Sequence, residues 1–235
     1  MQGAAPRVRE HRYVQRMNRG VVPASAVALA LALGCAPSGD EPEARSEPRS
    51  PAEEVVARLR LAGSPLPEPL AKPELALRDT EGRPFDFRAE TDGFLTLLFF
   101  GYTSCPDICP VHLANLAAVL AKDGELRRKV KVVFVGVDAG RDTPERVREF
   151  LGRFDSGFVG LTGTAEELER AQASAGVPVA FVDRSWEGGY SVSHAGWIVL
   201  FTPDNQARLR YPFGVRQREW AHDLAVLVRE GWPPS

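Results

Sequence analysis

Residues 94–120 combine an apolar run, a short turn, two cysteines and a helical stretch. The run FLTLLFF at 94–100 suits a strand that is buried on both faces. The turn GYTS follows, and CPDICP at 105–110 then opens a helix that we expect to begin near Cys109. Two cysteines four positions apart at a helix start are expected on one face, one turn from each other, where unpaired N–H groups lower thiol pKa values. Such a pair can form a disulfide, act as a redox couple or bind a soft metal.

Strands and helices alternate after this motif. Two short strands around a turn are predicted at 75–79 and 80–87, and further strands are predicted at 130–137, 158–161, 177–183, 197–202 and 207–211. Thr143 and Thr164 are expected to cap helices that end near 154 and 175, and an amphipathic helix is predicted at 217–230. This order predicts an α/β domain with a largely parallel sheet, a late antiparallel hairpin and helices on both faces. Because the cysteine pair follows a central strand, we expect a thioredoxin-like fold with a central mixed sheet flanked by helices.

The N-terminus has the order of an export signal. Several arginines precede the apolar run at 21–33, small residues follow it, and the run is too short for a comfortable membrane span. We therefore expect residues 1–34 to be a signal peptide, with Met17 as a second candidate start. The run ends LALGC, which resembles a bacterial lipoprotein box although Ala32 occupies the usual leucine place, so Cys35 is the expected lipidation site. Plain secretion and an uncleaved anchor are the alternatives.

Composition sets the remaining boundaries. Residues 35–72 are rich in Pro, Glu, Ala and Ser, so we expect a flexible tether, with a short helix at 53–61 inside it, ahead of a domain at 73–235. The formal net charge is −2, and the sequence has no stretch of basic residues interspersed with aromatic residues, which argues against a nucleic-acid partner. Three cysteines are too few for a disulfide scaffold.

The residues alone leave the role of the cysteine pair open. Inert packing is disfavoured because ligands usually bind where strands of such sheets end. A redox pair of the thioredoxin type would have two intervening residues rather than three, and a peroxidase of this fold would need Thr and Pro where Tyr102 and Leu98 stand. A metal site needs a third ligand. His222 is expected on the surface of the last helix, His112 can face the site or solvent, and His194 lies in a loop of small residues. A lone histidine is more often structural.

Several motifs together resemble the Sco/SenC family of copper-binding thioredoxin-like proteins. They are FFGYTSCPDICP at 99–110, VGVD at 135–138 with RDTP at 141–144, GLTG at 160–163, and the histidine ahead of the strand at 197–201. The resemblance extends from about residue 73 to the C-terminus. It implies that Cys105, Cys109 and His194 are ligands for copper, as Cu(I) or Cu(II). It also implies delivery of copper to the CuA site of cytochrome c oxidase, or reduction of that site's cysteines, with the CuA-bearing subunit or another copper chaperone as partner.

Elementary chemistry agrees with this ligand set. Two thiolates and an imidazole suit Cu(I), and hold Cu(II) with an added weak ligand, whereas structural zinc normally takes four protein ligands. We therefore expect a metallochaperone rather than an enzyme, held by a lipid anchor on the extracytoplasmic face of a membrane. The alternative is a thiol–disulfide oxidoreductase that uses Cys105 and Cys109.

The chain departs from the family pattern at two positions near the motifs. Ala139 stands where the family often has Pro, and Ser193 stands where it often has Asp. An Asp beside the histidine could act as a weak axial or supporting partner, so its absence bears on Cu(II) affinity and on the client. Asp138 and Asp142 are expected to be structural or interaction residues.

Overall fold

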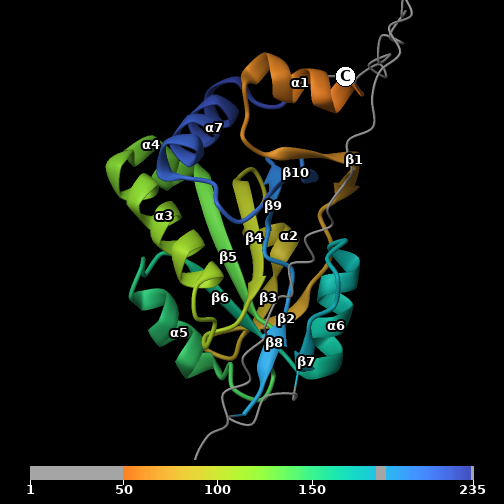
Figure 1. The fold of residues 1–235 in the computed structure, drawn as a ribbon, viewed down its shortest axis with the longest axis vertical. Coiled ribbons are helices and arrows are strands. Elements are labelled where there is room, and N and C mark those ends of the chain that lie inside the picture. Colours follow the sequence, from red (N-terminus) through yellow and green to blue (C-terminus); the bar gives the residue numbers. More distant parts are fainter. Residues whose placement is uncertain (1–49, 184–188, 234–235) are drawn as a thin grey trace, which may run out of the picture. The chain divides into compact units, whose positions relative to one another are not determined.

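The computed structural model describes residues 50–183 and 189–233 (Figure 1). The first part contains α1 (Pro51–Leu59), β1 (Ser64–Ala71), β2 (Ala76–Asp79), β3 (Pro84–Asp86), α2 (Phe87–Glu90) and β4 (Leu95–Gly101). Next come α3 (Ile108–Lys122), α4 (Gly124–Lys129), β5 (Val130–Gly136), α5 (Pro144–Gly152), β6 (Val159–Thr162) and α6 (Ala165–Ser174). The last part contains β7 (Phe181–Asp183), β8 (Ser191–Ser193), β9 (Ile198–Thr202), β10 (Gln206–Tyr211) and α7 (Gln217–Glu230).

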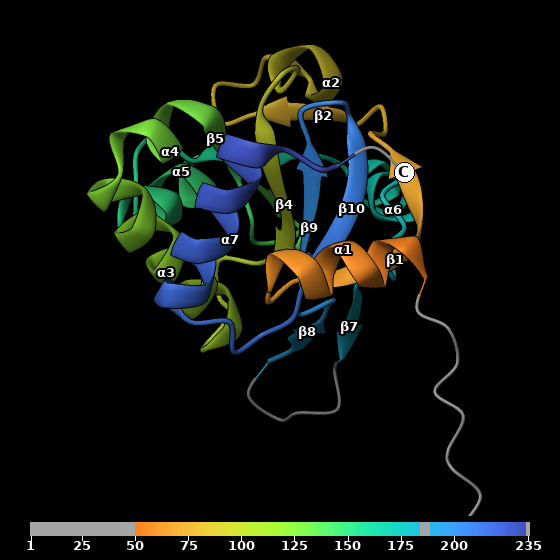
Figure 2. The same ribbon diagram turned by 90° about the horizontal axis from the view of Figure 1, so that it is seen from above.

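Eight of these strands form one mixed sheet in the order β1-β10-β9-β4-β5-β6-β2-β3. The β4–β5 and β5–β6 pairs are parallel. All other pairs in this sheet are antiparallel. Figure 2 shows α3, α4, α5 and α7 on one side of the sheet and α6 on the other. β7 and β8 form a separate two-stranded ribbon. The predicted thioredoxin-like α/β fold with a mixed sheet is confirmed, but the expectation of a largely parallel sheet is wrong, because only the β4–β5 and β5–β6 pairs of this sheet are parallel.

Strand β4 lies at the centre of the domain. All seven of its residues are buried, as its apolar sequence predicts. Leu97 and Phe99 face a core shared with α3 and α7, and Leu98 and Phe100 face a second core shared with α6. Since successive side chains of a strand point to opposite faces, an apolar residue at nearly every position is what a strand covered on both sides requires.

Local signals placed most of the other elements correctly. Thr143 and Thr164 accept hydrogen bonds from backbone N–H groups at the starts of α5 and α6, and Glu167 completes the expected capping box. The strand predicted at 177–183 is shorter, because only Phe181–Asp183 pairs. The sequence analysis did not predict α2, α4 or β8, each of which is six residues or shorter.

The short helix expected at 53–61 is present as α1, but the prediction of a flexible tether is wrong for residues 50–72. α1 begins at a capping box on Ser50, and β1 adds to the sheet beside β10. Pro65, Pro67 and Pro69 fit in β1 because it is an edge strand, where a missing backbone N–H need not break the ladder. Proline-rich composition therefore did not separate an edge strand from a flexible linker.

Other predictions about the N-terminus concern residues outside the described part of the chain. These are the signal peptide at 1–34, the alternative start at Met17, the lipidation site at Cys35 and the first part of the tether. Among residues 50–183 and 189–233, no helix has both the length and the apolar character needed to cross a membrane.

Candidate metal centre

The two cysteines of the motif lie on a turn and on the helix that follows it. α3 begins at Ile108, with Asp107 as its N-cap, so Cys105 precedes the helix and Cys109 is in its first turn. The expectation that both cysteines share one helical turn is therefore wrong. The physical reason is Pro106, since a residue that precedes proline is disfavoured in helical backbone geometry. The sulfurs still converge, because the Cys109 N–H donates to Cys105 Sγ at 3.4 Å.

His194 directly follows β8 and reaches the same place. Its Nδ1 lies 2.9 Å from the Phe100 carbonyl oxygen and 2.9 Å from the Ala195 carbonyl oxygen, so this nitrogen carries the proton. Nε2 faces the cysteines and lies 3.6 Å from Cys109 Sγ. A histidine whose second ring nitrogen donates to a carbonyl is the usual arrangement at metal sites, because that hydrogen bond fixes tautomer and ring orientation.

The ligand atoms of Cys105, Cys109 and His194 all lie within 4.8 Å of one another. An ion about 2.0–2.3 Å from each of three ligand atoms would separate them by roughly 3.5–4 Å, so little movement is needed to close the group around one ion. Cys109 is fully buried, Cys105 is 8% exposed and His194 is half-buried. The donor set of two sulfurs and one imidazole is one that soft metals prefer.

Hydrogen bonding and burial give the two thiols opposite acidities. The hydrogen bond with the Cys109 side chain lowers the pKa of Cys105 to about 4, so Cys105 is a thiolate at neutral pH. Burial raises the pKa of the Cys109 thiol, which stays protonated. The cysteine pair therefore carries one negative charge, on Cys105, before any ion binds. A metal that binds both sulfurs would displace the proton of Cys109.

Aromatic rings enclose the imidazole. The ring of Tyr102 meets the His194 ring edge-on with centroids 5.4 Å apart, and the Phe99 centroid lies 6.1 Å away. Burial raises the pKa of Tyr102, so its hydroxyl is neutral at physiological pH. These rings limit the directions from which the imidazole can approach the sulfurs.

Gly101 at the end of β4 makes room for Cys109. A Cβ at position 101 would lie 2.7 Å from Cys109 Sγ and 2.7 Å from Phe134 Cε2, which is closer than real contacts of this kind. The sequence analysis did not single out Gly101 as a functional residue. A glycine at the end of an otherwise apolar strand is the signal that could have revealed this close approach.

The other histidines take different roles. His112 is buried, and its Nε2 lies 3.3 Å from the Gly196 carbonyl oxygen. Burial lowers the pKa of His112, so the neutral ring donates this hydrogen bond and supports the backbone just after His194. His112 thus faces the interior but is not among the three clustered ligand residues. His222 is exposed on α7, as expected, with Nδ1 3.0 Å from Asp223 Oδ1.

Asp138 and Asp142 hold the loop between β5 and α5, in line with their expected structural role. Asp142 Oδ1 accepts hydrogen bonds from the N–H and the hydroxyl of Thr103, at 3.0 and 2.7 Å. Its other oxygen accepts from the Asp138 N–H at 3.1 Å. Burial raises the pKa of Asp142. This carboxyl group therefore connects the β5–α5 loop to the turn that carries Cys105.

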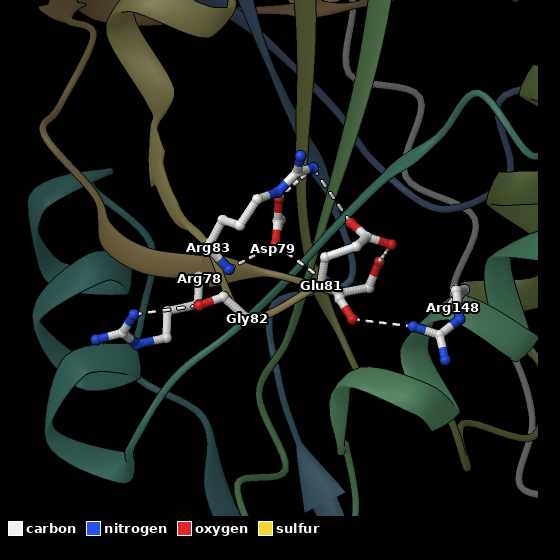
Figure 3. A network of polar contacts seen from close by, with 7 residues as sticks. Arg78, Asp79, Glu81, Gly82, Arg83 and Arg148 are labelled. Carbon is white, nitrogen blue, oxygen red and sulfur yellow. Dashed lines mark hydrogen bonds and ion pairs between the residues drawn. The ribbon is translucent and has the colours of Figure 1, made fainter.

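A separate cavity of about 650 Å³ lies between the β2–β3 turn, β6 and α5. Figure 3 shows the charged residues at its rim, where Arg83 pairs with Asp79 and Glu81, and Arg148 donates to the Thr80 carbonyl oxygen at 3.0 Å. The charge of Arg83 is paired within the turn, and the cavity is lined by none of the three clustered ligand residues. We therefore place the functional centre at the cysteines.

Fold and site together define a thioredoxin-like domain with a Cys–Cys–His cluster suited to a soft metal. A family model described as SCO1/SenC matches residues 65–229, and the protein belongs to this family. A Stutzerimonas stutzeri protein, provisionally named as copper-binding, is 39% identical over 145 residues, which are 61% of this chain and 70% of that protein. SenC of Rhodobacter capsulatus is 37% identical over 99 residues, and SCO1 homolog 1 of Arabidopsis thaliana is 37% identical over 113 residues. These two matches cover 38% and 48% of this chain, and only 45% and 34% of the relatives.

Solved structures agree with this assignment. Copper-bound ScoI of Bradyrhizobium japonicum is 31% identical with a TM-score of 0.58, and the match covers 69% of this chain and 97% of that one. Apo Sco1 of Thermus thermophilus is 29% identical with a TM-score of 0.63, over 71% and 96% of the two chains.

Proposed function

We propose that this protein is a copper metallochaperone that binds one copper ion through Cys105, Cys109 and His194. The observation that carries the proposal is the convergence of two sulfurs and an imidazole nitrogen within 4.8 Å of one another at the end of β4. The copper-bound ScoI relative supports copper as the ion. Soft sulfur ligands favour Cu(I), and the imidazole extends the set to Cu(II).

The graded burial of the ligands suits transfer rather than permanent storage. His194 and Cys105 lie nearer the surface than the fully buried Cys109. An acceptor's sulfur or imidazole could therefore replace His194 and Cys105 first, while Cys109 retains the ion until the exchange is complete. We propose assembly of the CuA site of cytochrome c oxidase as the destination, with the CuA-bearing subunit or another copper chaperone as partner. A structural relative is described as belonging to the Sco family of cytochrome c oxidase assembly proteins.

The proposed location follows from the N-terminal sequence. An export signal at 1–34 and lipidation of Cys35 would hold the domain at the extracytoplasmic face of a membrane. This location would place the centre in the compartment into which a CuA domain projects.

A second candidate function rests on the unequal acidity of the two thiols. The Cys105 thiolate could attack a client disulfide, form a mixed disulfide and release one client thiolate. Cys109 would then attack Cys105 Sγ, release the second client thiolate and leave a Cys105–Cys109 disulfide, so that two electrons pass to the client. The burial and raised pKa of Cys109 slow this second step.

Anaerobic loading of the reduced full chain with Cu(I) separates the two functions. We expect about one copper per chain, lost in Cys105→Ser and retained in Cys35→Ser, which controls for the third thiol. His194→Ala should lose tight copper binding and keep dithiol exchange, whereas His222→Ala should change neither. Failure of the wild-type chain to hold Cu(I) against a weak chelator would reject the chaperone and favour the oxidoreductase.

A further inference from the structure

Tyr190 connects the segment that carries His194 to the loop between β5 and α5 through hydrogen bonds. Its hydroxyl donates to Asp138 Oδ1 at 2.9 Å. The guanidinium carbon of Arg141 lies 3.8 Å from the centre of the Tyr190 ring, and Arg141 Nη1 donates to the Tyr190 carbonyl oxygen at 3.4 Å. Side chain and backbone of one residue are thus both held by the same loop.

The groups that hold Tyr190 are fixed in turn. Asp138 is 3% exposed and forms an ion pair with Arg141, and its own N–H donates to Asp142. Asp142 also accepts from Thr103, two residues before Cys105. One loop at 138–142 therefore contacts the cysteine turn through Asp142 and the histidine segment through Tyr190.

A short, ordered path leads from Tyr190 to the imidazole. β8 occupies the three residues between them and pairs with β7 in continuous register, with Val182 opposite Val192. Val192 is buried, and its backbone forms a hydrogen bond with the hydroxyl of Tyr102. Beyond His194, the Gly196 carbonyl oxygen accepts from His112. The segment at 190–196 is thus anchored on both sides of its ligand.

Gly140 in this loop leaves space for the Tyr190 hydroxyl. A Cβ at Gly140 would lie 3.3 Å from the Tyr190 oxygen and 3.6 Å from Asp138 Oδ1. A side chain at this position would therefore crowd the hydrogen bond between Tyr190 and Asp138. Position 140 therefore offers a way to disturb the contact without changing Tyr190.

We propose that Tyr190 is a positioning residue that sets the place of the His194 imidazole relative to the two sulfurs, and through it the balance between the two oxidation states of bound copper. This inference rests on the proposed copper function. Thiolates select Cu(I), whereas imidazole also suits Cu(II), so an imperfectly placed imidazole weakens Cu(II) more than Cu(I). Residues that hold a ligating histidine typically change metal affinity by about 10- to 100-fold when they are substituted.

The test is Tyr190→Phe in the full chain, which removes the hydroxyl and keeps the ring that stacks on Arg141. We expect Cu(II) affinity to fall about tenfold and Cu(I) affinity to fall less than about threefold, so that the reduction potential of bound copper rises. In the metal-free chain, amide hydrogen exchange at residues 191–195 should become faster. Gly140→Ala should act in the same direction with a smaller effect.

Tyr211→Phe is the matched control. The Tyr211 hydroxyl donates to Asp223 Oδ2 at 3.0 Å in a buried setting, so this variant removes a comparable tyrosine–aspartate hydrogen bond that contacts neither ligand segment. It should lower stability and leave the ratio of Cu(II) to Cu(I) affinity unchanged.

Two different results would separate the two hypotheses. If the wild-type chain binds copper but Tyr190→Phe lowers both affinities equally, with no faster exchange at 191–195, Tyr190 has only a structural role and the inference is wrong. If the wild-type chain binds neither Cu(I) nor Cu(II), the proposed copper function fails, and the positioning role for copper fails with it.

Discussion

The two ends of β4 each hold polar groups in a buried setting, but they hold them differently. Near the start of the strand, the ammonium of Lys72 donates to the carbonyl oxygen and hydroxyl of Thr91, at 2.9 and 2.8 Å, and to the Thr96 hydroxyl at 3.5 Å. Just beyond the end of the strand, Cys105, Cys109 and His194 bring two sulfurs and a nitrogen together.

The two groups differ in which of their polar atoms are hydrogen-bonded within the protein. Lys72 has three protons, and each has an oxygen partner within the domain. The imidazole uses Nδ1 for hydrogen bonds to carbonyl groups, so Nε2 faces the nearby sulfurs and lies 3.6 Å from Cys109 Sγ. Burial of polar atoms therefore does not by itself identify a binding centre. The convergence of two sulfurs and an imidazole nitrogen on one place is the more specific sign.

The largest effect is expected at the start of the strand, where burial lowers the pKa of Lys72 from 10.5 to about 8. Below pH 8 the folded and unfolded chains both carry the charge. Between about pH 8 and 10.5 the unfolded chain binds a proton that the folded chain does not, so the free energy of unfolding rises with pH. Relative to Lys72→Met, the wild type should gain about 3 kcal/mol over this range, as measured by urea denaturation.

Copper loading is the control for this variant. Lys72→Met should retain the wild-type copper stoichiometry because Lys72 lies at the other end of β4 from the sulfurs. A constant stability difference between wild type and variant from pH 8 to 10.5 would show that the lysine keeps its charge in the folded chain.

Gly101→Ala tests the close approach at the other end of β4. The new Cβ would overlap Cys109 Sγ and Phe134, and such overpacking typically costs about 1–3 kcal/mol. Because the sulfur must move, we also expect copper affinity to fall by about 10- to 100-fold in a chelator competition.

Gly152→Ala is the matched substitution at the end of α5, where no atom lies within 4 Å of the added Cβ. It should leave copper affinity unchanged and stabilise the helix slightly, by up to about 1 kcal/mol. Equal copper affinities for Gly101→Ala and the wild type would contradict the close packing of Gly101 against Cys109.

Thr103→Val should have an intermediate effect. It removes the 2.7 Å hydrogen bond from the hydroxyl to the buried Asp142 carboxyl group and keeps the one from the backbone N–H. We expect a loss of about 1–2 kcal/mol in the free energy of unfolding. Copper affinity should fall a little as well, because the turn that carries Cys105 becomes less fixed. A loss of stability without any change in copper affinity would indicate that Thr103 supports the loop alone.

Thr96→Val is the same substitution at the start of β4 and should have the smallest effect. The Thr96 hydroxyl receives only the longest of the Lys72 hydrogen bonds, and Lys72 keeps both contacts to Thr91. We expect a loss below about 1 kcal/mol in urea denaturation and no change in copper affinity. A larger loss than that of Thr103→Val would reverse the ranking of the two ends.

Local sequence signals were sufficient where neighbouring residues determine the structure. The apolar run of β4 and the Thr143 cap lie within single segments, and both predictions are confirmed. The expected start of the helix near Cys109 is confirmed, but the helical spacing expected between the two cysteines did not account for Pro106. Pattern alone left His194 as a structural residue, and only the family resemblance selected it. Its contact with Cys109 joins residues 85 positions apart, and Tyr190 meets Asp138 across 52 positions. Contacts of that range leave no periodic pattern in the sequence.

The pairing of β1 with β10 bears on how a shortened form of this protein should be cut. Asp223 on α7 is fully buried, and its Oδ2 accepts from the N–H groups of Ala62 and Gly63, at 2.8 and 3.2 Å. A fragment that began at residue 73 would leave that carboxylate short of donors and expose the β10 edge, which invites strand pairing between molecules. Truncations intended to remove the N-terminal segment should therefore retain the chain from Ser50 onward.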